Sequence, residues 1–250
     1  MQTGSTSSTA AWTPDLRRSV RLLGEFRHEQ TDPNRFYSAL AEDSVGQLST
    51  YLDLAGSTVL DVGGGPGYFR AAFRAAGADY WALDADVGEL SGAGRIEPGT
   101  VVGDGMNLPF GDGSVDLCYS SNVLEHVPDP WRMADEMLRV TRPGGIAFIS
   151  YTVWYGPWGG HETAPWHYLG GQRARRRYAA RHGHEPKNRY GESLFPVTVR
   201  AGLGWAKRQT AGEVVDVLPR YHPRWARGVL RVPGLREVAT WNLVLVVRKA

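Results

Sequence analysis

The sequence predicts an α/β fold with a doubly wound, mostly parallel sheet. From Thr58 to Thr152, short apolar segments alternate with segments of helical periodicity, which is typical of a sheet with helices on both faces. A glycine-rich turn at 63–67 joins the first strand to its helix. Polar residues follow several strands, at the edge where such sheets bind ligands. The 250 residues are enough for one domain with a sizeable core.

The N-terminal part predicts two helices ahead of the sheet. Residues 1–11 are rich in Ser, Thr and Gly, and we expect them to be disordered; they lack the apolar run of a signal peptide. Residues 13–15 and 31–33 both resemble capped helix starts. We expect these helices within 12–55, where they cover the ligand or flank the sheet. The apolar faces that follow the two starts are Leu16, Val20, Leu23 and Phe26, then Phe36, Leu40, Val45, Leu48 and Leu52.

The remainder is predicted to form one sheet, so that 12–250 is a single domain. The ligand-binding core is expected at 56–152, an insertion rich in Gly, Pro and aromatic residues at 153–197, and the completion of the sheet at 198–250. The predicted strands are 58–62, 80–83, 100–102, 115–120, 146–152, 214–218 and 242–247. The predicted helices are about 67–76, 130–140 (stopped by 142–145), 197–208 and shorter pieces within 221–240.

The glycine turn has the pattern D-x-G-x-G-x-G, formed by Asp61, Gly63, Gly65 and Gly67. Tyr68 stands where the dinucleotide fingerprint G-x-G-x-x-G needs its third glycine. A carboxylate before the turn suits a positively charged ligand and repels a pyrophosphate. The pattern therefore disfavours an NAD-dependent oxidoreductase, although a turn that merely connects strand and helix would look similar.

Further candidate ligands follow the next strands. Asp84 ends the second strand, where a carboxylate can accept hydrogen bonds from ribose hydroxyls. Asp104 follows the third strand and suits an adenine amino group, with Met106 beside the ring. Ser121 follows the fourth strand at the same edge.

In order and spacing, these elements together with 108–110 and 122–127 resemble the class I S-adenosylmethionine-dependent methyltransferases. The nearest type is methyltransferase type 11, which is similar to the ubiquinone/menaquinone methyltransferases, and the resemblance covers roughly 35–150. Residues 153–250 look like the tails of uncharacterised mycobacterial and actinobacterial methyltransferases. The resemblance implies a seven-stranded Rossmann-like sheet with an antiparallel closing strand, and S-adenosyl-L-methionine as cofactor.

The resemblance also implies roles for individual residues. The three glycines, Gly63, Gly65 and Gly67, would bring the backbone to the methionine and ribose parts, with Asp61 near the amino end. Asp84 would hold the ribose. Asp104 and Met106 would flank the adenine, and Ser121 would line the methionine portion.

Three histidines are candidate catalytic bases, because a hydroxyl acceptor must lose a proton and a histidine titrates near neutral pH. His126 follows the fourth strand, while His161 and His167 lie in the insertion. His126 could instead orient the following loop. The stretch 151–168 is rich in aromatic residues and predicts a substrate lid or wall, unless those aromatics simply pack the loop. Its candidate substrate-binding residues are Tyr151, Trp154, Glu162 and Tyr168. His161, Glu162 and His167 lack a recognised metal-ligand spacing, so no metal is expected.

Charge is divided unevenly along the chain. Residues 170–250 hold 17 Lys/Arg and 5 Asp/Glu, whereas 1–169 hold 11 and 21. The basic run 173–184 predicts peripheral contact with an acidic membrane surface, or else a solvated face. No segment is long and apolar enough to span a bilayer, and the one cysteine, Cys118, excludes an internal disulfide. We expect a cytoplasmic protein with a small-molecule, sugar or lipid substrate and no nucleic-acid partner.

The expected activity is O-methylation of a hydroxyl on a sugar, glycan or cell-envelope lipid. One alternative is C- or N-methylation of a quinone-like or other small metabolite. An alternative from another class is a non-catalytic module that binds S-adenosylmethionine.

Overall fold

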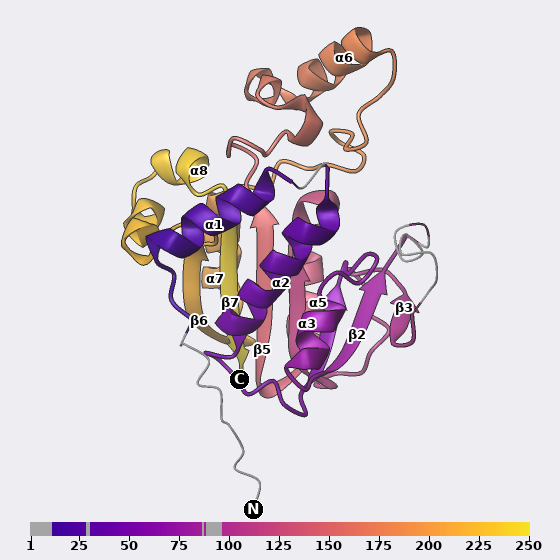
Figure 1. Cartoon of the computed structure of the whole chain (residues 1–250), viewed down its shortest axis with the longest axis vertical. Coiled ribbons are helices and arrows are strands. Elements are labelled where there is room, and N and C mark those ends of the chain that lie inside the picture. Colours follow the sequence, from indigo (N-terminus) through magenta and orange to yellow (C-terminus); the bar gives the residue numbers. More distant parts are fainter. Residues whose placement is uncertain (1–11, 29–30, 87, 89–96) are drawn as a thin grey trace, which may run out of the picture.

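The computed structural model describes residues 12–28, 31–86, 88 and 97–250, so the prediction of disorder for 1–11 lies outside the described residues. Figure 1 shows a central sheet with helices on both faces and a segment that projects beyond one edge. The α-helices are α1 (Leu16–Phe26), α2 (Pro33–Leu48), α3 (Arg70–Ala75), α5 (Pro130–Val140), α6 (Gly171–His182), α7 (Val199–Arg208) and α8 (Leu235–Ala239). The 3-10 helices are η1 (Leu124–His126), η2 (His161–Thr163), η3 (Trp166–Leu169) and η4 (Arg224–Arg231). The strands are β1 (Thr58–Val62), β2 (Asp79–Asp84), β3 (Thr100–Val102), β4 (Val115–Ser121), β5 (Thr141–Thr152), β6 (Gly212–Pro219) and β7 (Asn242–Lys249).

The sheet has seven strands in the order β3-β2-β1-β4-β5-β7-β6. β1 to β5 pair in parallel, while β7 is antiparallel to both of its neighbours. The predicted fold class is therefore confirmed, including the antiparallel closing strand. The chain crosses over at β1 and β4, and the carboxyl ends of these strands form the edge where doubly wound sheets bind ligands.

Helices cover the two faces of the sheet separately (Figure 1). α2 and α3 pack on one face against β1, β2 and β4, and Phe36, Leu40 and Phe73 are fully buried there. α5 and α7 pack on the other face, where Met137 and Trp205 are buried. The predicted helix starts are also confirmed. Asp15 accepts a hydrogen bond from the Arg18 amide, and Asp32 accepts one from the Arg35 amide, which satisfies amides that the first helical turn leaves free.

Two elements begin three or more residues away from their predicted starts, while the other differences are of one or two residues. The helix expected from about 67 begins at Arg70, because the left-handed backbone of Gly65 and Gly67 prolongs the turn. The fifth strand begins at Thr141, because Thr141 pairs with Val115 and the next four residues bulge out opposite Asp116 before pairing resumes. The sequence Arg-Pro-Gly-Gly therefore marks a bulge inside β5 and not the approach to the strand.

Residues 153–197 carry η2, η3 and α6, and they project beyond the carboxyl ends of the strands (Figure 1). The base of this insertion is held by a hydrogen bond from the Trp154 amide to the Val197 carbonyl. Near the base, the Trp158 ring lies 4.9 Å from the ring of Phe26 at the end of α1 and 4.8 Å from that of Trp241. The insertion is therefore docked against the sheet edge that carries the predicted site. Within the described part of the chain, no helix is long and apolar enough to cross a membrane.

Candidate functional site

The glycine turn is packed against protein at one end and open at the other. The amides of Gly63 and Gly64 both donate to the Leu83 carbonyl, at 2.7 and 3.2 Å. A Cβ added at Gly63 would lie 2.4 Å from Val123, so this end is filled. At Gly65, where φ is +48°, a Cβ would meet no described atom within 4 Å. The turn therefore exposes its backbone at Gly65, as a ligand site requires.

Two of the predicted acidic residues lie around this open end. Asp84 accepts a hydrogen bond from the Gly65 amide at 3.1 Å, so the tip of β2 contacts the turn directly. The Gly103 amide donates to the Asp84 carbonyl at 3.0 Å, which brings the tip of β3 beside it. Asp104 is exposed there and accepts from the Met106 amide. The structure thus brings Gly65, Asp84, Asp104 and Met106 to one edge.

Asp61 lies beneath the turn and not on its open side. Its side chain is buried and accepts a hydrogen bond from the Tyr80 hydroxyl at 2.5 Å. Burial raises the pKa of the Asp61 carboxyl to about 7, even though the Tyr80 hydrogen bond lowers it. The predicted contact with the cofactor's amino end is therefore not open in this structure.

Ser121 is bonded to a buried arginine that sequence reasoning missed. Arg220 follows β6 and is fully buried, and its guanidinium donates to Ser121 Oγ at 2.6 Å. Within the described structure, this guanidinium also donates hydrogen bonds to the hydroxyls of Ser150, Ser44 and Tyr119. β6 runs parallel to β5, so Arg220 lies at the same edge as the acids. The strand-end argument that selected Asp84 would have selected Arg220 too.

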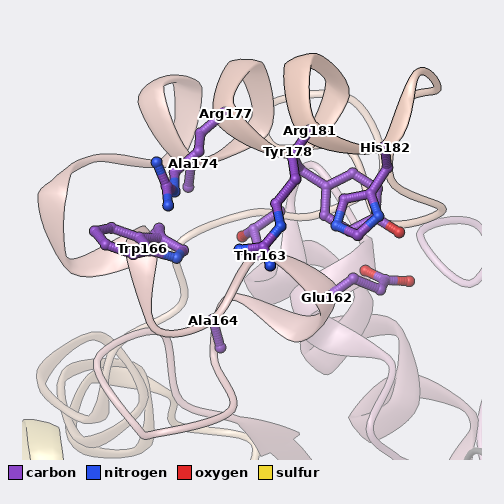
Figure 2. A pocket seen from close by; sticks show the side chains of 9 residues that line it. All are labelled: Glu162, Thr163, Ala164, Trp166, Ala174, Arg177, Tyr178, Arg181 and His182. Atoms are coloured by element: carbon purple, nitrogen blue, oxygen red, sulfur yellow. The ribbon is translucent and has the colours of Figure 1, made fainter.

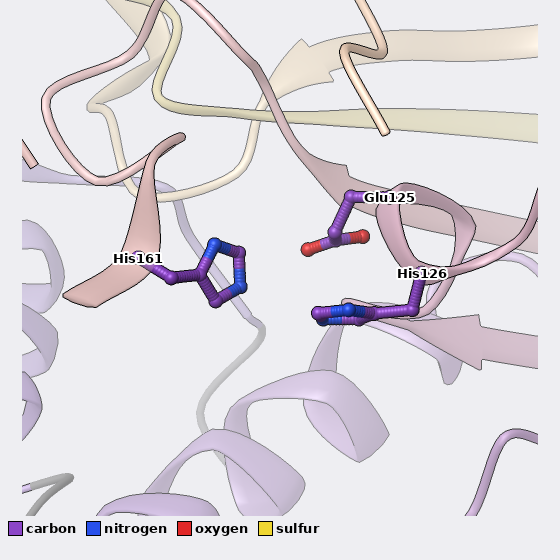
Figure 3. Close-up of side chains that lie close together, drawn as sticks. All are labelled: Glu125, His126 and His161. Atoms are coloured by element: carbon purple, nitrogen blue, oxygen red, sulfur yellow. The ribbon is translucent and has the colours of Figure 1, made fainter. Parts of the chain in front are cut away.

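A second cluster lies beyond β4, next to the packed end of the turn. Figure 3 shows Glu125 and His126 of η1 facing His161 of the insertion. The His126 and His161 rings are 5.0 Å apart, and one nitrogen of each imidazole and one carboxylate oxygen of Glu125 all lie within 4.8 Å of one another. Val123, two residues before Glu125, is the residue that abuts Gly63. The cluster is therefore adjacent to the glycine turn.

Hydrogen bonds fix the orientation of the cluster. The Nδ1 atom of His126 lies 2.8 Å from the Ser193 carbonyl oxygen, where only an N–H can bond, so in the neutral imidazole the lone pair is on Nε2. Glu125 Oε1 accepts from the Thr152 amide. Burial, with a smaller effect of His126, lowers the pKa of His161 to about 4, so that imidazole is neutral at pH 7. The cluster can accept a proton or donate lone pairs.

Comparison with known proteins identifies the family. Residues 60–149 match the family model described as a methyltransferase domain. An uncharacterized methyltransferase from Mycolicibacterium vanbaalenii is 56% identical over 243 residues, covering 93% of this chain and 94% of that protein. Another uncharacterized methyltransferase, from Mycobacteroides abscessus, is 54% identical over 246 residues, covering 93% of this chain and 94% of that protein.

The chain belongs to this family of methyltransferases.

Solved structures share the methyltransferase fold. An S-adenosylmethionine-dependent methyltransferase from Mesorhizobium loti superposes with a TM-score of 0.57 at 22% identity, covering 84% of this chain and 98% of that one. A putative S-adenosylmethionine-dependent methyltransferase from Listeria monocytogenes superposes with a TM-score of 0.54 at 15% identity. The match covers 85% of this chain and 99% of that one. S-adenosylmethionine is the cofactor of this methyltransferase.

The open end of the turn fits that cofactor. A side-chain-free backbone at Gly65 allows close approach, and Asp84 lies within hydrogen-bond reach of the same amide. Asp104 and Met106 lie on the adjoining loop, where the adenine is expected. Met106, Asp84 and Asp104 would hold the nucleoside part. Ser121 would line the methionine part, and the buried Arg220 would act there only through its hydrogen bond to Ser121.

Within the insertion of the methyltransferase, His167 does not join the histidine cluster. It is buried, its Nε2 lies 3.2 Å from the Gly156 carbonyl, and its ring packs on that of Trp154. Burial lowers the pKa of His167. Tyr151, which we predicted to face the substrate, is fully buried, and its hydroxyl donates to the Thr198 carbonyl. Trp154, which we also predicted to bind the substrate, is only 6% exposed and packs against the His167 ring. Tyr151, Trp154 and His167 are therefore packing residues, because the strand and the loop bury them.

The other two substrate candidates are exposed. The Tyr168 hydroxyl donates to the Tyr155 carbonyl, and Glu162 accepts from Asn188. Figure 2 shows Glu162 at a pocket of about 140 Å³ between α6 and the preceding 3-10 helices. This pocket is lined by Glu162, Thr163, Ala164, Trp166, Ala174, Arg177, Tyr178, Arg181 and His182.

The basic run forms α6, the outermost helix of the methyltransferase (Figure 1). Its described buried residues are small, Gly171 and Ala174. Arg175 pairs with Glu185 and Glu192, and Arg177 stacks over Trp166 at 3.9 Å. Part of the basic charge is thus compensated within the insertion, and contact with an acidic membrane stays a prediction.

Proposed function

We propose that this methyltransferase methylates a hydroxyl oxygen of a sugar, a glycan or a cell-envelope lipid. The observation that carries the proposal is the position of Glu125, His126 and His161 beside the glycine turn. A hydroxyl is a weak nucleophile until its proton is removed, whereas amine acceptors need less help. A proton-accepting cluster on the acceptor side of the cofactor therefore favours an oxygen acceptor.

When bound, S-adenosylmethionine supplies an activated methyl group. The chain's own residues position the partners and move the proton. Asp84 and Gly65 hold the donor side, because their contact fixes the tip of β2 against the turn. His126 presents Nε2 to the acceptor hydroxyl, because Ser193 holds its other ring nitrogen. The buried carboxylate of Glu125 stabilises the positive charge that His126 gains with the proton.

The acceptor class is supported by the surface of the insertion. Tyr155, Trp166 and Tyr168 are each more than 40% exposed, although large aromatic side chains are usually buried. Aromatic faces stack on sugar rings and also contact acyl chains. The pocket beside Trp166 adds Arg177, Arg181 and Glu162, which can bond to sugar hydroxyls or anionic groups.

Mass spectrometry of labelled products tests the proposal. A mycobacterial envelope extract is incubated with the enzyme and deuterated-methyl S-adenosylmethionine. We expect the label in a methyl ether of a glycan or lipid. His126→Ala should lower its formation by about 100-fold or more at saturating cofactor, while the exposed His184→Ala serves as matched control. Label on nitrogen or carbon, or an active His126→Ala variant, would refute the proposal.

A further inference from the structure

We propose that Glu125, His126 and His161 form a binding site for a divalent transition metal, with Zn²⁺ as the best-suited ion. The site stands on the geometry of the cluster alone, whereas its use in catalysis rests on the function proposed above. No metal was expected from the sequence, because the third ligand, His161, comes from a segment far along the chain. The other possible ligand set, His161 with Glu162 and His167, is not brought together in the structure. The Glu162 carboxylate accepts a hydrogen bond from Asn188, and the His167 ring bonds to the Gly156 carbonyl.

The ligand atoms are close enough for one ion. Two imidazole nitrogens and a carboxylate oxygen, all within 4.8 Å of one another, face a common centre (Figure 3). Tetrahedral bonds of about 2.0–2.1 Å place neighbouring ligand atoms about 3.4 Å apart. Binding therefore requires the side chains to move inward by roughly 1 Å, which small rotations of χ1 and χ2 provide. Nitrogen and oxygen donors in this combination suit zinc and similar ions.

The partners around the cluster leave lone pairs pointing into it. The His126 Nδ1–H is held by the Ser193 carbonyl, and this kind of outer hydrogen bond fixes the tautomer of metal-binding histidines. Glu125 Oε1 accepts the Thr152 amide, but its buried Oε2 has no hydrogen-bond partner among the described residues. A carboxylate that is 2% exposed is costly to leave half-paired. A bound cation would satisfy that oxygen.

The backbone conformation of His161 directs its side chain towards the cluster. Its φ is +49°, in the left-handed region that non-glycine residues rarely adopt. Hydrogen bonds from the His161 amide to Trp158 and from Ala164 to the His161 carbonyl hold it there. Strain of this kind persists where the structure needs a side chain in one place, and here it directs the imidazole at Glu125 and His126.

Three protein ligands leave a fourth position for an oxygen. In the proposed reaction the acceptor hydroxyl occupies it, and the cation lowers the pKa of that hydroxyl. The O–H bond breaks and the proton passes to water. The oxygen electron pair then forms the O–CH3 bond, while the methyl–sulfur bond breaks and its electron pair stays on sulfur. In this form of the mechanism the histidines act as ligands and not as the base.

Metal titration of the full chain tests the site. The protein is stripped with a chelator and titrated with Zn²⁺ by calorimetry, and with Co²⁺ by visible absorption. We expect one equivalent to bind, with a tetrahedral cobalt spectrum. Glu125→Gln and His161→Asn should each weaken binding by about 100-fold or more, exceeding the effect of losing an outer hydrogen bond. Glu162→Gln and His184→Asn are matched controls, and cofactor affinity reports that each variant is folded.

The outcomes separate this inference from the proposed function. Absence of stoichiometric binding, or equal binding by His161→Asn and the parent, overturns the metal site. Full label transfer by chelator-treated enzyme, with His126→Ala inactive, overturns the use of the metal in catalysis and leaves histidine as the base. One equivalent of metal that is lost in both ligand variants establishes the site, even if the labelled atom then proves not to be oxygen.

Discussion

The Tyr80 hydroxyl donates a hydrogen bond to the Asp61 carboxyl at 2.5 Å, directly beneath the glycine turn. Both side chains are buried, at 1% and 2% exposure. Burial raises the pKa of Asp61 to about 7, whereas an aspartate in an unfolded chain titrates near 4. Between about pH 4 and 7 the folded protein therefore binds a proton that the unfolded chain has lost. This contribution to stability is present at low pH and is lost as the pH rises through 7.

Asp61→Asn should accordingly stabilise the protein at pH 8.5, because the amide avoids burying a charge and can still accept from Tyr80. The expected gain in the free energy of unfolding is at most about 4 kcal/mol, at 1.36 kcal/mol per pKa unit, and it should shrink steadily towards pH 4. Urea unfolding at several pH values measures it. Tyr80→Phe should shift the titration to higher pH, and a gain independent of pH would contradict the assignment.

Gly63 and Gly65 should differ in what an added methyl group disrupts. Gly63→Ala places a Cβ 2.4 Å from Val123 and should destabilise the fold by roughly 2–4 kcal/mol, from overpacking and left-handed strain. A Cβ added at Gly65 would meet no described atom within 4 Å. Gly65→Ala should therefore lower the free energy of unfolding by only about 1 kcal/mol but weaken cofactor binding by at least about tenfold.

Urea unfolding and calorimetry with S-adenosylmethionine separate these two effects. Gly56→Ala is the matched control, because Gly56 has φ +75° and no described neighbour within 4 Å of an added Cβ, but it lies outside the turn. It should share the strain of Gly65→Ala and leave cofactor affinity unchanged. Unchanged affinity in Gly65→Ala would place the cofactor elsewhere.

Arg220 should contribute to both stability and cofactor affinity. Arg220→Gln removes the charged hydrogen bonds that the guanidinium donates to the buried hydroxyls of Ser44 and Ser150, and we expect a loss of about 3 kcal/mol or more in unfolding free energy. It also removes the cation beside Ser121, so affinity for S-adenosylmethionine should fall. Thermal and urea unfolding with calorimetry measure both, and the exposed Arg224→Gln is the control. Parent-like behaviour of Arg220→Gln would show that the cation serves neither purpose.

Local periodicity was sufficient to predict the order and type of the sheet elements, because each strand and its following helix bury one regular apolar pattern. It failed at the start of β5, where Thr141 pairs ahead of a bulge, because the pairing depends on Val115 and not on neighbouring residues. It also placed the start of the helix after β1 too early, since backbone conformation at Gly67 is not visible as a pattern.

The site was predictable where it lies at strand ends. Asp84 and Gly65 are in contact as their positions implied. The meeting of His161 with Glu125 could not be deduced, because it depends on how the insertion folds back onto η1. Tyr151 was misread for a related reason: its position in an aromatic stretch gave no sign that α7 covers it, where its hydroxyl meets Thr198.

The two halves of the site have different origins in the chain. The donor side is built from tips of the sheet, whereas His161 and the exposed aromatic side chains arrive with residues 153–197. Replacing that one segment would change which molecules are modified without disturbing how the methyl donor is held. Gene duplication followed by divergence of this segment would then yield enzymes with new acceptors on an unaltered scaffold, and grafting it between relatives offers a route to exchanging their specificities.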